Sequence, residues 1–520
     1  MRRTARVVCL VLAIGAYGLT FAQVSSDARL EKAFKRPPQN GWTFVHLEGT
    51  PAQIGFQHGY LLAHEIADGS QVIQLELPHD TGKAWQFFRE AAEKVLWPRI
   101  EDQYREELQG IVAGLKAQAV NLDLWDVVAV NAWLELGYYA SWYDQKHNLE
   151  GRPKGAVPER CSAFLATGRF TRDGKIVMGH NAWTGYADGT RWTIIYDIVP
   201  ARGHRILMDG YPGIIHSGDD FGINSAGIMI TETTISGFAG FKTEGIPEFV
   251  RARKAMQYAS SIDEFVQIIR EGNNGGYANT WLAGDRKTGE IARLELGLKN
   301  VTLARTKDGF YGGANFPINP KLARQETSFP VKDRGVSANA RHNRWKQLAA
   351  EYKGRVDVET GKKFLSDHYD TYAKKEEPNE RTLCGHIDLS QRGAKPWQPP
   401  YGVAGAIQAK LADSSMAERM SLMVAAGHPC GIHFHAGEHL EAFEAVYLLL
   451  YHLARVGVEG RDDGDHRLQD GVDALGPDGD DGVRGAEGQF AFGGIGGEAE
   501  RGRDNEQGHN DDCEQSQSTH

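Results

Sequence analysis

The sequence predicts an α+β fold in which layers of antiparallel sheet are covered by helices. From residue 161 to about 298, short β-like runs are joined by turn signals such as RDGK, PARGH and DRKTGE. Runs joined by such turns pair as antiparallel hairpins. Helical segments stand between the hairpins, as in IPEFVRARKAMQYASSIDEFVQIIREG, and a mostly helical stretch precedes them. A sheet must bury its apolar face, so hairpins and helices together indicate stacked layers.

The size and charge of the chain limit the kinds of partner that it can have. Its 520 residues are enough for one large unit of sheets and helices or for several domains. The net charge is −10, and no stretch stands out as a cluster of Lys and Arg. Phosphate binding needs such clusters, so we expect no nucleic-acid partner.

The first 22 residues have the pattern of a secretory signal peptide. A basic start is followed by an apolar run from Val7 to Leu19 and by small residues at Thr20 and Ala22. The run is shorter than the roughly 20 residues of a spanning helix, which favours cleavage before Gln23 over an uncleaved anchor. We therefore expect a secreted or periplasmic protein, not transmembrane once residues 1–22 are removed.

The rest of the chain divides into four predicted parts. Residues 23–144 form a helical N-terminal segment in which EDQYREELQGIVAGLKAQ and LDLWDVVAVNAWLELGYY carry apolar stripes, and VHLEG forms a strand before the first helix. Residues 145–160 are polar and carry Pro and Gly, so they form a cleavable linker. Residues 161–432 are the core, and 433–520 are a Gly-, Asp- and Glu-rich tail that we expect to be disordered.

Within the predicted core, two further assignments rest on local pattern. Ser261, with Glu264 three residues later, is a helix cap that separates two helices of the inserted segment. Residues 337 to 430 mix helices, such as RHNRWKQLAAEY and SMAERMSLMVAA, with extended pieces such as GVAGAIQAKL.

Four cysteines remain after signal removal: Cys161, Cys384, Cys430 and Cys513. An exported protein can form disulfides, and four cysteines allow three complete pairings. Cys384 and Cys430 lie in ordered-looking sequence, so we favour a bridge between them. Cys161 is then a free thiol, although a buried or bridged thiol is the simpler alternative.

Cys161 begins a predicted strand directly after the linker. If the bond between Arg160 and Cys161 is cut, the new α-amine has an unperturbed pKa of about 7.7–8.0 and can act as a base for the thiol. A hairpin turn at residues 172–175 brings His180 and Asn181 back beside the cysteine. This pattern is typical of a nucleophile that is created by cleavage.

Two long blocks, CSAFLATGRFTRDGKIVMGHNAWTGY and MDGYPGIIHSGDDFGINSAGIMITETTISGF, resemble the phospholipase B-like proteins, a group of N-terminal nucleophile (Ntn) hydrolases. With LEGTPAQIGFQHG and NTWLAGDRKTGEIARLE, the chain also resembles the penicillin acyltransferase family of Ntn cysteine hydrolases. The resemblance runs in scattered blocks from about residue 43 to 431. It implies an αββα sandwich of antiparallel sheets, precursor cleavage before the cysteine and an acyl-thioester intermediate.

The resemblance also implies roles for individual residues. Cys161 is the nucleophile and its freed amine the base, His180 matches a site position, Asn279 supplies an amide to the oxyanion, and Arg341 or Arg344 favours the thiolate. We assign substrate contacts to Asn181, Trp183, Asp220 and Glu232. Each has a simpler structural alternative: the His can cap the hairpin, the amide can cap a turn, the carboxylates can bind backbone donors, and the arginines can lie at a helix surface.

A second group of possible ligands is HPCGIHFHAGEH, with His428, Cys430, His433, His435 and His439. Close His and Cys side chains can bind zinc or copper. The family resemblance fades just after HPCG, where the composition changes as it would after a shifted reading frame. We therefore predict no metal and no cofactor.

Together these inferences predict an exported, phospholipase B-like Ntn cysteine hydrolase. It would hydrolyse an amide or ester acyl bond of a small molecule or lipid, with the N-terminal fragment remaining associated after cleavage. One alternative is an acyltransferase or linear amidase of the penicillin acyltransferase type. The other is a non-catalytic secreted binding protein on the same fold.

Overall fold

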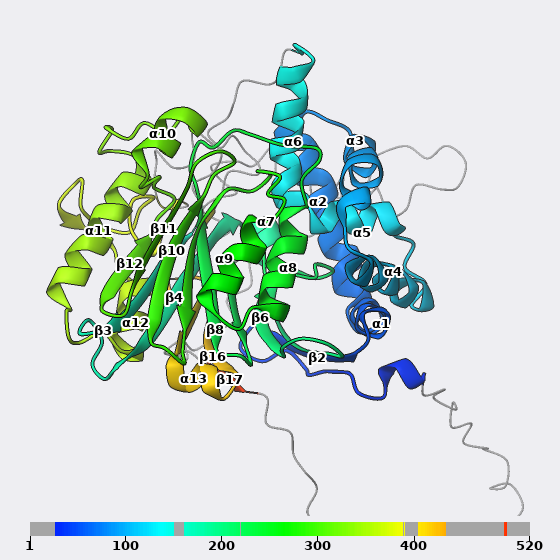
Figure 1. Ribbon diagram of the computed structural model, residues 1–520, viewed down its shortest axis with the longest axis horizontal. Coiled ribbons are helices and arrows are strands. Elements are labelled where there is room, and N and C mark those ends of the chain that lie inside the picture. The colour runs from blue at the N-terminus through cyan, green and yellow to red at the C-terminus, as the bar shows by residue number, and fades with distance from the viewer. Residues whose placement is uncertain are drawn as a thin grey trace, which may run out of the picture.

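The structure is a computed structural model that describes residues 27–149, 161–218, 220–387, 389, 404–432 and 493–496. Two large sheets stack face to face, and helices cover both outer faces (Figure 1). The predicted α+β fold, an αββα sandwich, is confirmed.

The larger sheet has nine strands in the order β1-β2-β5-β6-β7-β8-β9-β10-β11. Neighbouring strands are antiparallel except β2 and β5, which run parallel. The strands are β1 (Phe34–Lys35), β2 (Thr43–Gly49), β5 (Ile194–Pro200), β6 (Ile206–Gly210), β7 (Phe221–Asn224), β8 (Ile228–Thr234), β9 (Asn279–Asp285), β10 (Glu290–Leu296) and β11 (Val301–Thr306).

The smaller sheet has six strands, all antiparallel, in the order β12-β3-β4-β15-β16-β17. A short hairpin forms a separate two-stranded sheet. The strands of the six-stranded sheet are β3 (Ser162–Gly168), β4 (Gly174–Gly185), β12 (Gly309–Gly313), β15 (Ala404–Asp413), β16 (Ser421–Ala426) and β17 (Gly493–Gly496), and those of the hairpin are β13 (Tyr369–Asp370) and β14 (Lys375–Glu376).

Side chains alternate between the two faces of each strand, which divides the core into layers. Along β3, Ala163 and Leu165 point between the sheets, whereas Phe164 and Ala166 pack against helices on the outer face. The same alternation along β4 places Ile176 and Met178 between the sheets. His180 follows them at the same spacing, so a polar residue enters an otherwise apolar layer.

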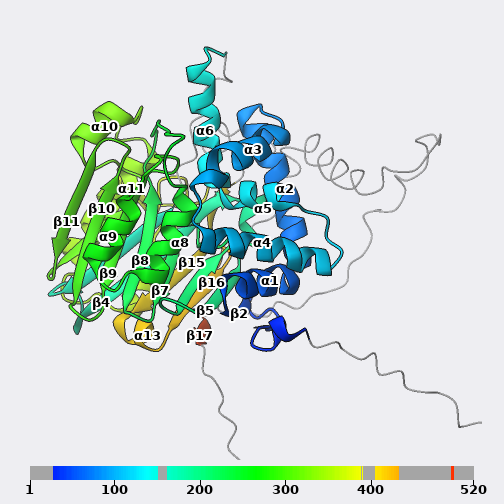
Figure 2. The same ribbon diagram turned by 45° about the vertical axis from the view of Figure 1, so that its right-hand side comes forward.

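The outer face of the nine-stranded sheet is covered by the N-terminal helices and by two helices inserted between β8 and β9 (Figure 2). The N-terminal helices are α1 (Pro51–Leu61), α2 (Ala63–Thr81), α3 (Trp85–Ala91), α4 (Asp102–Ala117), α5 (Leu124–Asn131) and α6 (Trp133–Lys146), with a π-helical turn at Ala92–Leu96; the inserted helices are α8 (Glu248–Tyr258) and α9 (Ile262–Arg270).

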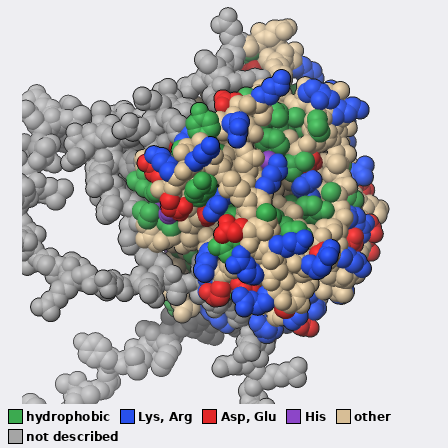
Figure 3. Space-filling view, turned by 90° about the vertical axis from the view of Figure 1, so that its left-hand side faces the viewer, with side chains coloured by type: hydrophobic (Ala, Val, Ile, Leu, Met, Phe, Trp, Pro, Cys, Tyr) green, Lys and Arg blue, Asp and Glu red, His purple; other side chains and the backbone are tan. Residues whose placement is uncertain are grey.

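The outer face of the six-stranded sheet is covered by α11 and α12. Figure 3 views the molecule from the left-hand side of Figure 1, where Lys and Arg side chains are prominent among apolar ones. The remaining helices are α7 (Tyr186–Gly189), α10 (Pro320–Glu326), α11 (Ser337–Glu351), α12 (Val358–Leu365) and α13 (Ser414–Glu418).

Most predicted local elements are confirmed. The hairpin β3–β4 turns where expected, and Ser261 caps α9 by accepting a hydrogen bond from the Glu264 N–H. The predicted helix SMAERMSLMVAA is wrong: α13 ends at Glu418, and Ser421–Ala426 forms β16. Pairing with β15 overrides the helix propensity of Met, Ala and Leu here.

Several expectations concern residues outside the described ranges. These are the signal peptide at 1–22, most of the linker including Arg160, and the tail from 433 except β17. His433, His435, His439 and Cys513 are therefore not placed. Among the helices that the structure does describe, none is both long and apolar enough to cross a bilayer.

Candidate active site

Cys161 lies directly before β3, between the two sheets, and only 3% of its surface is exposed. Its φ angle is 77°, in the left-handed region that residues other than glycine seldom adopt. Such backbone conformations cost about 1–3 kcal/mol and persist where the surrounding structure enforces them, often at functional sites. The strain therefore singles out Cys161 on geometric grounds.

The Cys161 thiol contacts Trp183 of β4 and Asp220, the residue directly before β7. It donates to Oδ1 of Asp220 over 3.9 Å and accepts a hydrogen bond from the backbone N–H of Trp183. Nε2 of His180 lies 3.7 Å from the same Asp220 oxygen. Sulfur, imidazole and carboxylate thus meet around one buried point, where they lie within 4.8 Å of one another.

A buried lysine holds the carboxylate of this group. Lys410 of β15 is the register partner of His180, and its Nζ lies 3.0 Å from Oδ2 of Asp220 and 3.0 Å from Oδ2 of Asp209. All three charged side chains are less than 5% exposed. One ammonium group therefore sits between two carboxylates in the core.

Burial and neighbouring charges determine which protonation states this site favours. Burial, followed by the charges of Asp220 and Glu232, raises the pKa of Cys161 well above its usual value. Burial and the nearby Lys410 lower the pKa of His180 well below its usual value. In the intact chain the thiol is therefore protonated and the imidazole neutral, so His180 is not a cationic partner for a thiolate.

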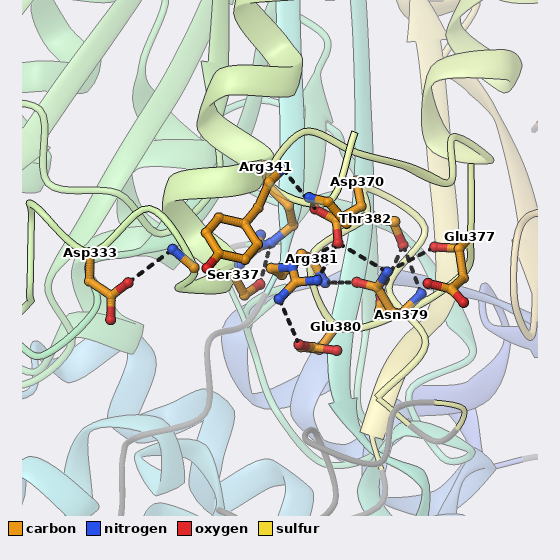
Figure 4. A network of polar contacts seen from close by, with 12 residues as sticks. Asp333, Ser337, Arg341, Asp370, Glu377, Asn379, Glu380, Arg381 and Thr382 are labelled. Atoms are coloured by element: carbon orange, nitrogen blue, oxygen red, sulfur yellow. Dashed lines mark hydrogen bonds and ion pairs between the residues drawn. The ribbon is translucent and has the colours of Figure 1, made fainter. Parts of the chain in front are cut away.

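Arg341 on α11 holds the backbone at the cysteine. Its Nη1 donates to the carbonyl of Cys161 and, over 3.2 Å, to Oγ of Ser162, while Nη2 donates to Oδ1 of Asn315 over 2.9 Å. The guanidinium lies 4.3 Å from the ring centre of Trp183. Figure 4 shows Arg341 within a polar network that includes Ser337 of the same helix.

The structure distinguishes Arg341 from Arg344, which the sequence analysis left as alternatives. Arg344 lies one turn further along α11 and binds the carboxylate of Asp367 through Nε and Nη2, over 2.9 and 2.6 Å. Arg341 instead contacts the cysteine directly.

Three other residues predicted for the site, Asn181, Asn279 and Glu232, lie on β4, β9 and β8. The side-chain amide of Asn181 donates to the carbonyls of Leu365 and Leu383, so it fastens β4 to the segments behind it. Asn279 is buried at the start of β9, where it pairs with Thr234. Glu232 is buried on β8, close enough to Cys161 to influence its pKa, and its Oε1 accepts a long hydrogen bond from Tyr277.

Lys410, Asp209 and Asn315 belong to this site but were not predicted from the sequence. The available signal was that Lys410 is a single charge in the apolar run GAIQAKLA. A lysine on a buried strand is rare unless it is paired, so this position indicated a buried ion pair. Its partners come from β6 and from the start of β7, about 200 residues earlier in the chain. No local pattern connects such distant residues.

The predicted disulfide between Cys384 and Cys430 is wrong. Neither cysteine is disulfide-bonded in this structure, and with His368 and His386 they form a second group whose ligand atoms lie within 4.8 Å of one another. This group is separate from Cys161 and could also hold a metal ion.

The fold and the position of the cysteine define a class of protein. The chain is an αββα sandwich with a cysteine directly before an inner strand, the arrangement that the resemblance to Ntn hydrolases led us to expect. Comparison with known families confirms the more particular resemblance: the Phospholipase B family model matches residues 82–294, a range that includes Cys161, His180, Asp220 and Asn279.

Curated relatives cover different parts of the chain. An uncharacterized protein of Archaeoglobus fulgidus is 24% identical over 392 residues, 68% of this chain and 62% of the relative. Phospholipase B-like protein C of Dictyostelium discoideum is 24% identical over 35% of each chain. Phospholipase B of Crotalus adamanteus is 26% identical over 49% of each. The chain thus spans less than two thirds of the length of these relatives.

Among solved structures, the chain aligns with a variant of the conjugated bile acid hydrolase of Clostridium perfringens. The alignment has 11% identity and a TM-score of 0.32, and it covers 51% of this chain and 89% of the other. The sheet topology, and not this alignment, establishes the αββα fold.

Proposed function

We propose that the chain is an exported Ntn cysteine hydrolase that breaks an amide or ester acyl bond after its own cleavage before Cys161. The observation that carries this proposal is the strained, buried Cys161, whose carbonyl is held by Arg341 and whose sulfur is held by Trp183 and Asp220. The match to the Phospholipase B family over this region supports an acyl hydrolase.

Cleavage would begin with attack of Cys161 Sγ on the carbonyl carbon of Arg160. The peptide C–N bond breaks, a thioester forms, and the former amide nitrogen takes up protons to become the α-amine. Water then hydrolyses the thioester, which leaves a carboxylate on Arg160 and a free thiol on Cys161. The strained φ angle supports this step because cleavage releases the constraint on the backbone.

The freed amine would then serve as base in each turnover. It removes the thiol proton, the thiolate attacks the acyl carbonyl, and the leaving amine or alcohol receives the proton as the thioester forms. The amine next activates a water molecule, which releases the acyl group as a carboxylic acid and restores the thiol. The nearby Asp220 carboxylate supports the cationic amine while it holds the proton.

Association of the two fragments after cleavage is supported by the sheet topology. Strand β2 comes from the N-terminal segment, yet it lies in the nine-stranded sheet and pairs with β5 from the core along seven register positions, Thr43 to Gly49. The helices of the same segment cover this sheet. A cut before Cys161 would leave these contacts intact.

The substrate class rests on the family resemblance. We propose a small molecule or lipid with an apolar acyl chain, and the route above serves phospholipid esters and linear amides equally. Export is supported by the N-terminal sequence pattern.

The test is the N-terminus of the mature protein. Intact mass and N-terminal sequencing should find two co-purifying fragments, one starting at Cys161, and Cys161→Ala should leave a single chain without activity toward phospholipids or acyl amides. Cys161→Ser, which keeps a weaker nucleophile, should cleave more slowly. An uncut wild-type chain with full activity, or an active Cys161→Ala variant, would overturn the proposal. An uncut and inactive wild-type chain would favour the binding-protein alternative.

A further inference from the structure

A second group of histidines and cysteines lies at the end of the six-stranded sheet. His368 follows α12, Cys384 and His386 lie two residues apart in a later loop, and Cys430 follows β16. Each offers one ligand atom, and the four atoms lie within 4.8 Å of one another. Residues from three separate segments thus converge on one point.

The measured separations fit a tetrahedral zinc ion. Zn–S and Zn–N bonds of about 2.3 and 2.0–2.1 Å at tetrahedral angles place a sulfur and a nitrogen ligand about 3.6 Å apart. Nε2 of His386 lies 3.5 Å from Sγ of Cys384 and 3.3 Å from Sγ of Cys430. Two cysteines and two histidines are also the ligand types of structural zinc sites.

We propose that His368, Cys384, His386 and Cys430 bind one zinc ion as a closed structural site. Two thiolates and two neutral imidazoles satisfy a tetrahedral ion without an open position, so the site has no place for substrate or reactive water. The ion would join the loop around residue 384 to the segments at 368 and 430.

Surrounding contacts hold these ligands in place. The backbone N–H of Ile432 donates to Sγ of Cys430 over 3.4 Å. The ring of His386 stacks on His428 with ring centres 4.0 Å apart, and Nε2 of His428 is hydrogen-bonded to the hydroxyl of Tyr186 over 2.8 Å. Such outer contacts orient metal ligands.

A buried ion pair closes the loop that separates His368 from Cys384. Arg381 binds the carboxylate of Asp370 through Nε, over 2.8 Å, and through Nη2 (Figure 4). Both side chains are nearly fully buried, and Asn379 donates to the same carboxylate oxygen. The loop ends are thus brought together by contacts that do not involve the proposed zinc ligands.

The group around Cys161 also meets the distance requirement for a metal site, but its charges argue against one. Lys410 already places a cation 3.0 Å from the Asp220 carboxylate. Near the second group, Arg344 pairs with Asp367 and Arg381 pairs with Asp370. The carboxylate at Cys161 thus already has a counter-charge, which disfavours a second cation there.

The experiment uses the full chain, expressed without a histidine tag and purified with a phosphine reductant that keeps thiols reduced. Elemental analysis should find about one zinc per chain. Substitution by cobalt should give the visible and near-ultraviolet absorption bands of a tetrahedral cobalt–thiolate site. Cys384→Ser and Cys430→Ser should each reduce the zinc content at least fivefold.

Two control variants separate this proposal from its alternatives. Cys161→Ser should retain zinc, so the result does not depend on cleavage or on the proposed hydrolase activity. A triple variant, His433→Ala, His435→Ala and His439→Ala, should also retain zinc. Loss of zinc in either control, with retention in Cys384→Ser, would overturn the proposal.

A disulfide is the competing state of the same two cysteines. Zinc-free reduced protein that fails to take up added zinc, or native protein with Cys384 bonded to Cys430, would overturn the proposal. If the serine variants do not fold, thermal unfolding decides instead: removal of zinc by a chelator should lower the Tm of wild type and of Cys161→Ser equally. An unchanged Tm in both would also refute the site.

Discussion

The two cysteine groups of this chain each place a thiol near an imidazole but have opposite electrostatics. Around Cys161, burial and then the carboxylates of Asp220 and Glu232 raise the pKa of the thiol well above its usual value. Around Cys430, hydrogen bonds with Cys384, His368 and His386 lower the pKa of the thiol well below its usual value. Both groups place sulfur beside imidazole, so the identity of the neighbours alone does not determine the state of the thiol.

The difference lies in the third partner. Asp220 is an acceptor, and the cation that balances it, Lys410, lies on the far side of the carboxylate from the sulfur contact, on the other oxygen. Both sulfurs accept a backbone N–H, Cys161 from Trp183 and Cys430 from Ile432. Where Cys161 meets Asp220, however, Cys430 is hydrogen-bonded to Cys384, His368 and His386. Carboxylates near a buried cysteine favour the protonated thiol, whereas hydrogen-bond donors near the sulfur favour the thiolate, which is the form that binds a metal.

The largest effect should follow removal of the cation at the first group. Lys410→Met leaves two buried carboxylates without their counter-charge, and breaking a buried pair typically costs 3–5 kcal/mol. We expect the free energy of unfolding in urea to fall by about that amount. Lys410→Arg keeps the charge and should lose less. A loss below about 1 kcal/mol in the Met variant would show that the carboxylates are neutral without the lysine.

A pH dependence should distinguish the buried carboxylates. Burial, partly opposed by Lys410, raises the pKa of Asp209 to about 7, above its unfolded value near 3.8. The stability from its protonated form is therefore present at pH 4 and lost as the pH rises through 7. Relative to wild type, Asp209→Asn should gain on the order of 3 kcal/mol between pH 4 and 8, measured by urea unfolding.

This prediction would be contradicted if the difference in stability between wild type and Asp209→Asn did not change with pH. It would mean that Asp209 is ionised throughout and that Lys410 outweighs burial. The Lys410→Met variant should shift the transition to higher pH, because the remaining effects on Asp209, burial and the charge of Asp220, both raise the pKa.

A glycine connects the two groups by direct packing. A Cβ on Gly385, between Cys384 and His386, would lie 2.1 Å from the Trp183 ring, which stacks on Arg341. Gly385→Ala should therefore destabilise the protein by about 1–3 kcal/mol, the usual cost of overpacking, and reduce both zinc content and activity. Gly137→Ala on α6 is the control, because nothing lies within 4 Å of its added Cβ. Equal stability of the two variants would exclude this coupling.

The arginines of α11 provide a test of positioning. Arg341→Lys loses the planar fork that reaches the Cys161 carbonyl, Ser162 and Asn315. We expect kcat to fall about 10- to 100-fold, as misplacement of a reacting group by about 1 Å can do. The matched variant Arg344→Lys alters contacts with Asp367, Gln347 and the Tyr369 ring, away from Cys161, and should leave kcat within about twofold. Equal falls in kcat for Arg341→Lys and Arg344→Lys would contradict the idea that Arg341 alone of the two positions Cys161.

The smallest effect should come from a surface ion pair on the β3–β4 turn. Arg172 binds Asp357 over 2.8 Å, but its side chain is 68% exposed. Exposed pairs contribute about 0–1 kcal/mol, so Arg172→Ala should change the free energy of unfolding by less than about 1 kcal/mol. Raising the salt concentration should reduce the difference further.

The sequence predicted the parts of this molecule that depend on local pattern. Hairpins, the Ser261 cap and sheet layers covered by helices follow from turn residues and periodicity, whereas the αββα arrangement came from the family resemblance. The position of Cys161 after the linker singled out its thiol. The error at residues 421–426 arose because pairing with β15 made this segment of ambiguous propensity a strand. Lys410, Asp209 and the contact between His368 and Cys430 join distant segments, so no local pattern could show them.

The position of Lys410 in the chain has a consequence for biosynthesis. It lies about 250 residues after Cys161, on a central strand of the six-stranded sheet, yet it holds the carboxylate beside the thiol. At about 5–20 residues per second, a ribosome reaches it roughly 12–50 s after the cysteine. During that interval the nascent chain carries the proposed nucleophile without the strand that completes its surroundings. Maturation would thus be timed by translation of the C-terminal half of the core.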